Sequence, residues 1–145
     1  CTFTVDGSLF GIDVTCVQEV IRYQEMTEVP LSSPVVSGLI NLRGQIVTAI
    51  DLRRRLKLKP RPTEQPPMNV VVRHDEGTVS LLVDEIGDVV DVDEASFEEA
   101  PETLAADTRA LLRGVYKLNP KLLLPLNTEL ATQVDSNLNQ GNGHG

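Results

Sequence analysis

The sequence predicts an all-β protein built from two small barrels that are related by an internal duplication. Three observations lead to this prediction. Apolar residues make up 41% of the 145 residues, but aromatic residues only 3% and Trp is absent, so Val, Leu and Ile must build the core, and these residues favour strands. Short apolar runs alternate with turn residues along most of the chain. The order of these runs in the first half recurs in the second.

The first element of each half is a predicted hairpin. Residues 2–5 and 8–14 predict two strands joined by Asp6-Gly7, a dipeptide suited to a tight turn with positive φ. Residues 69–72 and 78–83 predict the same hairpin 69 positions later, around a turn that contains Gly77.

The elements that follow also match. A short apolar segment comes next, at residues 17–21 and at residues 86–90, and each copy then runs through a polar stretch to a proline. A second hairpin follows at residues 38–52 and, 76 positions on, at residues 114–127. Both copies read strand, turn with Gly or Pro, strand. Each copy therefore supplies four or five short strands, and the two units bury an edge against each other.

The duplication sets the expected domain boundaries. We expect one domain over residues 1–132, with the first barrel at about 1–60 and the second at about 68–130. Residues 57–67 contain four prolines and predict an extended linker, preceded by one or two helical turns that carry a basic face. Residues 133–145 are polar and rich in Gly and Asn, and we expect a disordered tail.

The charge pattern limits the classes of partner. The net charge of −8 argues against a nucleic acid, because phosphate binding needs a basic surface. Six of the 13 basic residues fall within residues 53–61, whereas residues 74–108 contain twelve acidic residues and no Lys or Arg. Two interpretations stay open: two solvated faces, or a polarity that docks differently charged partners.

The sequence shows no constellation typical of an enzyme or a cofactor site. His74 lies at a predicted turn and His144 in the tail, so neither is placed as a general base beside a nucleophile. Asp84, Glu85 and Asp88 alternate with apolar residues, so we expect a solvent face there rather than a metal site. No apolar run approaches the roughly 18–20 residues of a membrane span. We expect no catalysis, no cofactor, no metal and no membrane insertion.

Two blocks of the sequence carry distinctive motifs. Residues 10–21 contain Phe-Gly-Ile-Asp-Val and then Val-Gln-Glu-Val-Ile, and residues 38–52 contain Asn-Leu-Arg-Gly followed by Ile-Asp-Leu. Both blocks resemble the CheW family of chemotaxis coupling proteins. The second half agrees with the family at residues 82–84, 89–90, 114–115 and 122–124, so the resemblance covers about residues 1–130.

The resemblance implies two SH3-like five-stranded β-barrels with a hydrophobic groove between them. It also implies a cytoplasmic adaptor without enzymatic activity. Such proteins bridge the cytoplasmic tips of chemoreceptors to a CheA-type histidine kinase, whose regulatory domain resembles CheW. A helical receptor hairpin would lie in the groove. A coupling protein for pilus motility or phototaxis is an open alternative, and a small-barrel oligonucleotide binder is a weaker one.

The resemblance also assigns site residues by position. Those implied in receptor and kinase coupling are Val17, Glu19, Gly38, Asn41, Leu42, Arg43 and Gly44. Those implied in kinase binding are Met68, Ser80 and Val89. Ser80 stands where the family has Gly, Met68 where it has a β-branched residue, and Thr48 where it has Pro.

Two further expectations concern side-chain orientation. We expect an intramolecular ion pair between Glu19 and Arg43 at the rim of the groove. Val20 and Ile21 have apolar counterparts in the second copy at Val89 and Val90, so both pairs are predicted to face the barrel interior. Val17 is predicted to line the receptor groove, because Glu19 two residues on must reach water.

Overall fold

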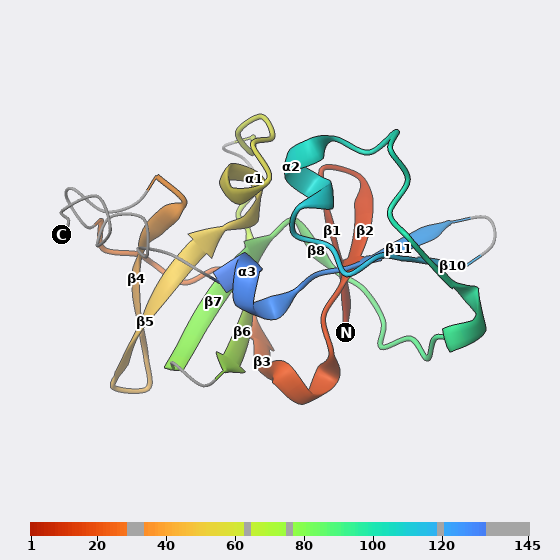
Figure 1. The fold of residues 1–145 in the computed structure, drawn as a ribbon. Helices are drawn as coiled ribbons and strands as arrows, with labels where there is room; N and C mark the ends of the chain where they lie inside the picture. Colours follow the sequence, from red (N-terminus) through yellow and green to blue (C-terminus); the bar gives the residue numbers. More distant parts are fainter. Residues whose placement is uncertain (29–33, 63–64, 75–76, 119–120, 133–145) are drawn as a thin grey trace, which may run out of the picture.

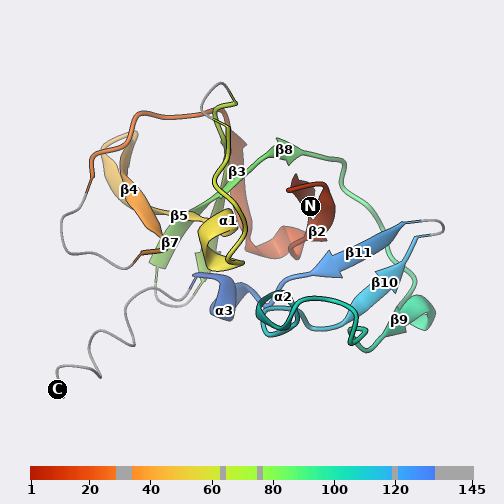
Figure 2. The same cartoon turned by 90° about the horizontal axis from the view of Figure 1, so that it is seen from above.

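The computed structural model describes residues 1–28, 34–62, 65–74, 77–118 and 121–132. The predicted turn at 75–76 and the predicted tail at 133–145 lie outside these residues. The strands form two sheets that lie side by side in both views (Figures 1 and 2). The all-β fold class is therefore confirmed, with short helices between and beside the sheets.

The first sheet has six strands in the order β8-β1-β2-β11-β10-β9. Their bounds are Glu85–Ile86, Thr2–Val5, Ser8–Gly11, Leu122–Pro125, Val115–Lys117 and Phe97–Glu98. The second sheet has five strands in the order β3-β6-β7-β5-β4. Their bounds are Val17–Ile21, Met68–His74, Gly77–Val83, Gln45–Asp51 and Val36–Leu42. The helices are α1 (Leu52–Arg55), α2 (Ala106–Arg109) and α3 (Thr128–Thr132), with 3-10 turns η1 (Val14–Cys16) and η2 (Glu94–Ser96).

The predicted division into a barrel at residues 1–60 and a barrel at residues 68–130 is wrong. The first sheet takes β1 and β2 from the first copy and its other strands from the second copy. The second sheet takes β6 and β7 from the second copy and its other strands from the first. In Figure 1 the red hairpin β1–β2 accordingly joins the blue strands β10 and β11, while green β6 and β7 join the strands β4 and β5. The opening hairpins of the two copies are therefore exchanged: β1–β2 lies in the sheet of the second copy, and β6–β7 lies in the sheet of the first.

The duplication itself agrees with the strand pairing. In β1–β2, Phe3 lies opposite Phe10, and 69 positions further on Val72 lies opposite Val79 in β6–β7. The equivalence extends to the pairs that join the two copies. Parallel partners Leu124 and Phe10 correspond to the parallel partners Thr48 and Val79 when the offsets of 76 and 69 are applied. The order β3-β6-β7-β5-β4 thus becomes β8-β1-β2-β11-β10, and β9 extends the first sheet beyond the five predicted strands.

The two sheets share one large core, because alternate residues of each strand face the other sheet. Buried residues of this shared core come from both sheets and from the helices, and they include Phe3, Phe10, Leu52, Val70, Leu81 and Leu124. A smaller cluster fills the far face of the second sheet and consists of Ile40, Leu42, Val47 and Val71. The predicted core of Val, Leu and Ile is therefore present, and most of it seals the contact between the sheets.

An ion cluster fastens the linker to the fold. Arg53 donates through Nε and Nη2 to the two carboxylate oxygens of Asp84, at 3.0 and 2.6 Å, and Arg61 Nε donates to Asp84 Oδ1 at 2.9 Å. The expectation of a solvent face at Asp84 is wrong for this residue, whose side chain is 15% exposed. The helical turn expected before the linker is present as α1. Its basic face is smaller than expected, because Arg53 points inward whereas Arg54 is exposed.

Candidate partner-binding surfaces

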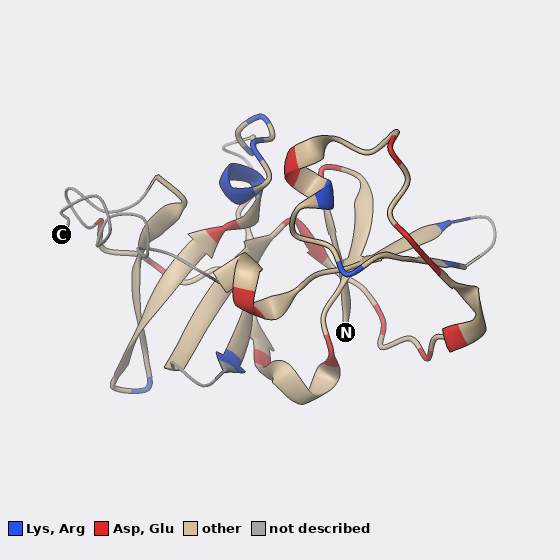
Figure 3. Ribbon diagram, in the orientation of Figure 1, with Lys and Arg blue, Asp and Glu red and all other residues tan. Residues whose placement is uncertain are grey.

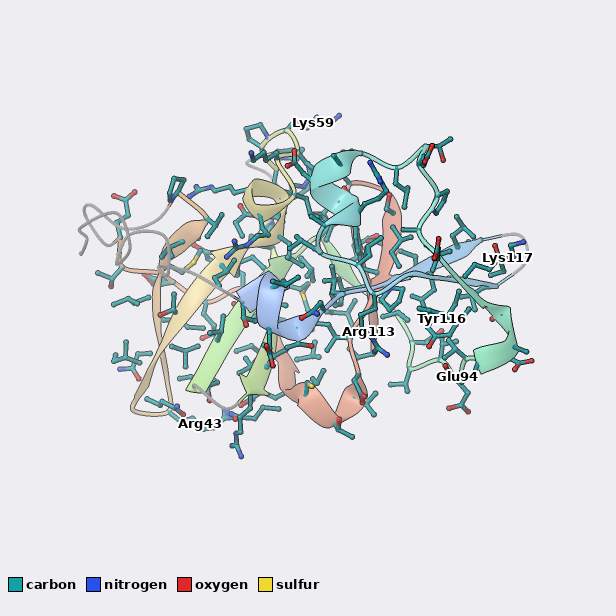
Figure 4. The ribbon with its side chains drawn as sticks, in the orientation of Figure 1. Arg43, Lys59, Glu94, Arg113, Tyr116 and Lys117 are labelled. Atoms are coloured by element: carbon teal, nitrogen blue, oxygen red, sulfur yellow. The ribbon has the colours of Figure 1, made fainter. Side chains whose placement is uncertain are left out.

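Arg43 lies at the tip of the β4–β5 hairpin, at the lower edge of the molecule in Figure 4. Arg43 and Gly44 form a two-residue turn with φ of 52° and 88°, the positive values that a type I′ hairpin turn needs at both positions. Asn41 Oδ1 accepts a hydrogen bond from the amide of Gly44 at 2.9 Å and closes this turn. The Asn-Leu-Arg-Gly block is therefore a hairpin whose geometry presents Arg43 to solvent.

The predicted ion pair between Arg43 and Glu19 is present. The Arg43 side chain is 68% exposed and that of Glu19 is 21% exposed. The pair therefore joins the hairpin tip to β3, the strand at the opposite end of the sheet order, at the surface. A second polar bridge lies on the same sheet, where Arg73 donates to Gln18 at 2.8 Å. Ile46, next to the turn, is 61% exposed. This hairpin end, made of Glu19, Arg43 and Ile46, combines a cation with an exposed apolar side chain, and sequence reasoning missed Ile46.

Two other predicted residues of this set are buried. Leu42 packs in the smaller core cluster. Gly38 is buried in β4, and a Cβ at this position would lie 2.7 Å from the carbonyl oxygen of Thr27. The same requirement appears 76 positions on, where a Cβ at Gly114 would lie 2.6 Å from the carbonyl oxygen of Glu98. Both glycines let an extra segment approach the edge of a sheet, so each is required by the packing of the fold.

Val17 and Glu19 face opposite sides of β3, because a bulge interrupts the pairing between them. Val17 lies opposite Val72, whereas Glu19 lies opposite Val71. Neighbouring residues of a strand point to opposite faces, so the bulge at Gln18 reverses the orientation that spacing by two predicts. Val17 is half-buried and packs against the shared core.

The two residues of the middle strands for which the resemblance implies kinase binding are not free surface groups. Met68, at the start of β6, is half-buried against the shared core. Ser80 is fully buried, and its hydroxyl donates to Asn69 Oδ1 at 2.7 Å. A polar side chain is accommodated there because Asn69 pairs with it inside the sheet.

Val89 is placed differently from the expectation. The prediction that Val20, Val89 and Val90 face the interior is wrong, since their exposures are 37%, 69% and 37%. Ile21 is half-buried and packs on the smaller cluster, as expected for an inward side chain. Val89 and Val90 line the same pocket as Val14, which is 49% exposed. We call Val14, Val89 and Val90 the valine patch.

The valine patch borders a pocket of about 420 Å³. The pocket opens on the first sheet, with Thr2, Tyr116 and Leu123 in its lining. Their equivalents in the second sheet by the offsets of 69 and 76 are Val71, Ile40 and Val47, which belong to the small, filled cluster. The two sheets therefore differ here: the face turned away from the shared core is packed in the second sheet and holds a pocket in the first.

Charged groups surround this pocket. Tyr116 donates to Glu94 at 3.0 Å, and burial together with this carboxylate raises the pKa of Tyr116 (Figure 4). Asp13 accepts hydrogen bonds from the amide and hydroxyl of Thr15, which lower the pKa of Asp13. Arg113 also lines the pocket. Figure 3 shows acidic residues spread over this lobe, while basic residues gather on α1 and the loop after it, as the charge pattern of the sequence predicts.

Within the parts of the chain that the structure describes, no group of three or more His, Cys, Asp or Glu residues could hold a metal ion. None of the described helices is long and apolar enough to cross a membrane.

Comparison with known proteins identifies the family. The family model of the CheW-like domain matches residues 1–134. The chain is 35% identical over 121 residues to the chemotaxis protein CheW of Bacillus subtilis, an alignment that covers 83% of this chain and 78% of the relative. It is 28% identical over 127 residues to the chemotaxis protein CheW of Klebsiella aerogenes, covering 88% and 76%.

A solved structure agrees with the fold. The scaffolding protein TtCheW from Thermoanaerobacter tengcongensis matches with a TM-score of 0.77 and 29% identity, over 87% of this chain and 86% of that one. Family, fold and the absence of catalysis expected for a scaffold are thus established together. The chain belongs to the CheW-like family, the non-catalytic scaffold proteins of chemotaxis.

Proposed function

We propose that this chain couples the cytoplasmic tips of chemoreceptors to the regulatory domain of a CheA-type histidine kinase within receptor arrays. One observation carries the proposal beyond family membership. The hairpin end lies on the second sheet and the valine patch borders the pocket of the first sheet, and the sheets are interlocked by strands of both copies. Two partners that bind these surfaces would be held at a fixed separation and orientation.

The hairpin end is the proposed receptor contact. Arg43 is exposed and tethered by Glu19, so its guanidinium is oriented before a partner arrives and still has donors to offer. Ile46 beside it can insert into a partner's apolar surface. Gly38 and Leu42 support the hairpin from inside, and Asn41 and Gly44 set its turn.

The valine patch is the proposed kinase contact. Val89 and Val14 are 69% and 49% exposed, and exposed apolar side chains that gather in one patch mark interaction sites. Val17 and Met68 pack against the shared core, so we assign them a supporting role and not a direct contact. Ser80 is buried, so we assign it a role in the sheet instead of a direct contact.

Two parallel pull-downs test the assignment. One uses a receptor signalling fragment as bait, and the other uses a kinase regulatory domain. We expect Arg43→Ala to weaken retention on the receptor fragment by roughly 5- to 150-fold, about 1–3 kcal/mol, and to leave retention on the kinase domain unchanged. We expect Val89→Asp to give the opposite result. Lys121→Ala, another exposed cation, is the matched control. Loss of both contacts in either variant, or of neither in both, would contradict the two-surface proposal.

A further inference from the structure

Each sheet of this fold is completed by strand pairs that join the first half of the chain to the second. Among the described strands, four pairings cross between the halves, namely β3 with β6, β5 with β7, β1 with β8 and β2 with β11. The shared core draws buried residues from both halves, and the pairing of Arg53 with Asp84 crosses between them as well. Neither half can complete a sheet with its own strands.

A single covalent connection links these halves, between Leu56 at the end of the α1 turn and Met68 at the start of β6. It contains Pro60, Pro62, Pro66 and Pro67, and Pro-rich segments are stiff and extended, at about 3 Å per residue. Eleven residues of this composition form a spacer, and an exchange between molecules requires this spacer to lead to a neighbouring copy. Its first part stays fastened wherever the second half comes from, since Arg53 Nη1 donates to the carbonyl of Lys59 at 3.2 Å within the first half.

We propose that two copies of this chain exchange their second halves, residues 68–132, and form a dimer in which each two-sheet body combines the first half of one copy with the second half of the other. The same kind of exchange already exists inside the monomer, where the opening hairpins of the two repeats have changed places with matching registers. The exchanged dimer retains every strand pair and the shared core, so only the connection and the entropy of association distinguish it from the monomer. It would carry two hairpin ends and two valine patches, independently of which partners bind them.

A disulfide that joins the two halves reports the exchange. Thr4 and Glu85 lie opposite each other in β1 and β8 and belong to different halves. Thr4→Cys/Glu85→Cys, made with Cys1→Ser and Cys16→Ser, is unfolded, refolded at low and at high protein concentration, and then oxidised. We expect a non-reducing gel to shift from the monomer of 15.9 kDa to a covalent dimer of about twice that mass as the refolding concentration rises.

The matched control places both introduced cysteines in one half. Thr4 and Leu9 lie opposite each other in β1 and β2, so Thr4→Cys/Leu9→Cys in the same background should stay monomeric on the gel even when size-exclusion chromatography shows a dimer. Chromatography of the unsubstituted chain, refolded in the same way, guards against misfolding of the variants.

Two results would overturn the proposal. The first is that the unsubstituted chain refolds only as a monomer at high concentration. The second is that Thr4→Cys/Glu85→Cys forms dimers by chromatography but no interchain disulfide between its two introduced cysteines, because two complete bodies would then associate by their surfaces.

Discussion

Substitution of Asp84 tests how the linker and both sheets are held together. The carboxylate accepts four hydrogen bonds, two from Arg53, one from Arg61 and one from the amide of Asp6 at 2.7 Å. Burial alone would raise the pKa of Asp84, but hydrogen bonds from Arg53, Asp6 and Arg61 outweigh it and lower the pKa to about 2. The fold therefore stabilises the ionised form.

The magnitude follows from the pKa. A carboxyl group whose pKa falls from 3.8 to about 2 on folding contributes about 2 kcal/mol to stability when ionised. Because the folded pKa is the lower one, this contribution is complete above the unfolded value near 4 and disappears as the pH falls through about 2. Asp84→Asn keeps the shape but loses the charge beside two guanidinium groups that are 6% and 8% exposed. We expect a loss of at least about 2 kcal/mol at pH 7.

Urea unfolding at pH 7 and near pH 2 measures this effect. At pH 7 Asp84→Asn should unfold at clearly lower urea than the unsubstituted chain, and near pH 2 the two should converge. Glu85→Gln is the control, since Glu85 is exposed and forms no ion pair among the residues that the structure describes. Equal midpoints for Asp84→Asn and Glu85→Gln at pH 7, or a difference that persists unchanged near pH 2, would refute the role given to the ionised carboxylate.

Three further outcomes follow from the packing. Gly38→Ala should lower stability by about 1–3 kcal/mol in thermal melts, because its Cβ would press on the Thr27 carbonyl; an unchanged melting temperature would show that this edge segment yields freely. Val17→Met should cost about 1 kcal/mol, because Val17 is half-buried on the shared core; reduced kinase-domain binding at unchanged stability would instead make Val17 a contact residue. Val89→Ser should leave the melting temperature within about 1–2 °C of the parent, since Val89 is 69% exposed; a large drop would mean that it is part of the core.

The sequence alone determined the local elements. Asp6-Gly7 and Arg43-Gly44 adopt the positive φ that their hairpins require, and the apolar runs between them become strands. The offsets of 69 and 76 also predicted which residues occupy equivalent positions, down to the register of paired strands. These features depend on neighbours within a few residues, so pattern and turn chemistry suffice to predict them.

Only the tertiary structure decided which hairpin joins which sheet. Pairing β2 with β11 brings together residues more than a hundred positions apart. The apolar run of β2 could pair equally well within its own copy, because the alternation of apolar and polar residues favours a strand but does not specify its partner strand. Side-chain exposure followed from that choice. Asp84 became largely buried because Arg53 and Arg61 lie against it, and Val89 became exposed because no described strand covers it. The bulge at Gln18 separated Val17 from Glu19. Burial is a property of what packs against a residue, and for Asp84 and Val17 the packing partners come from the other half of the chain.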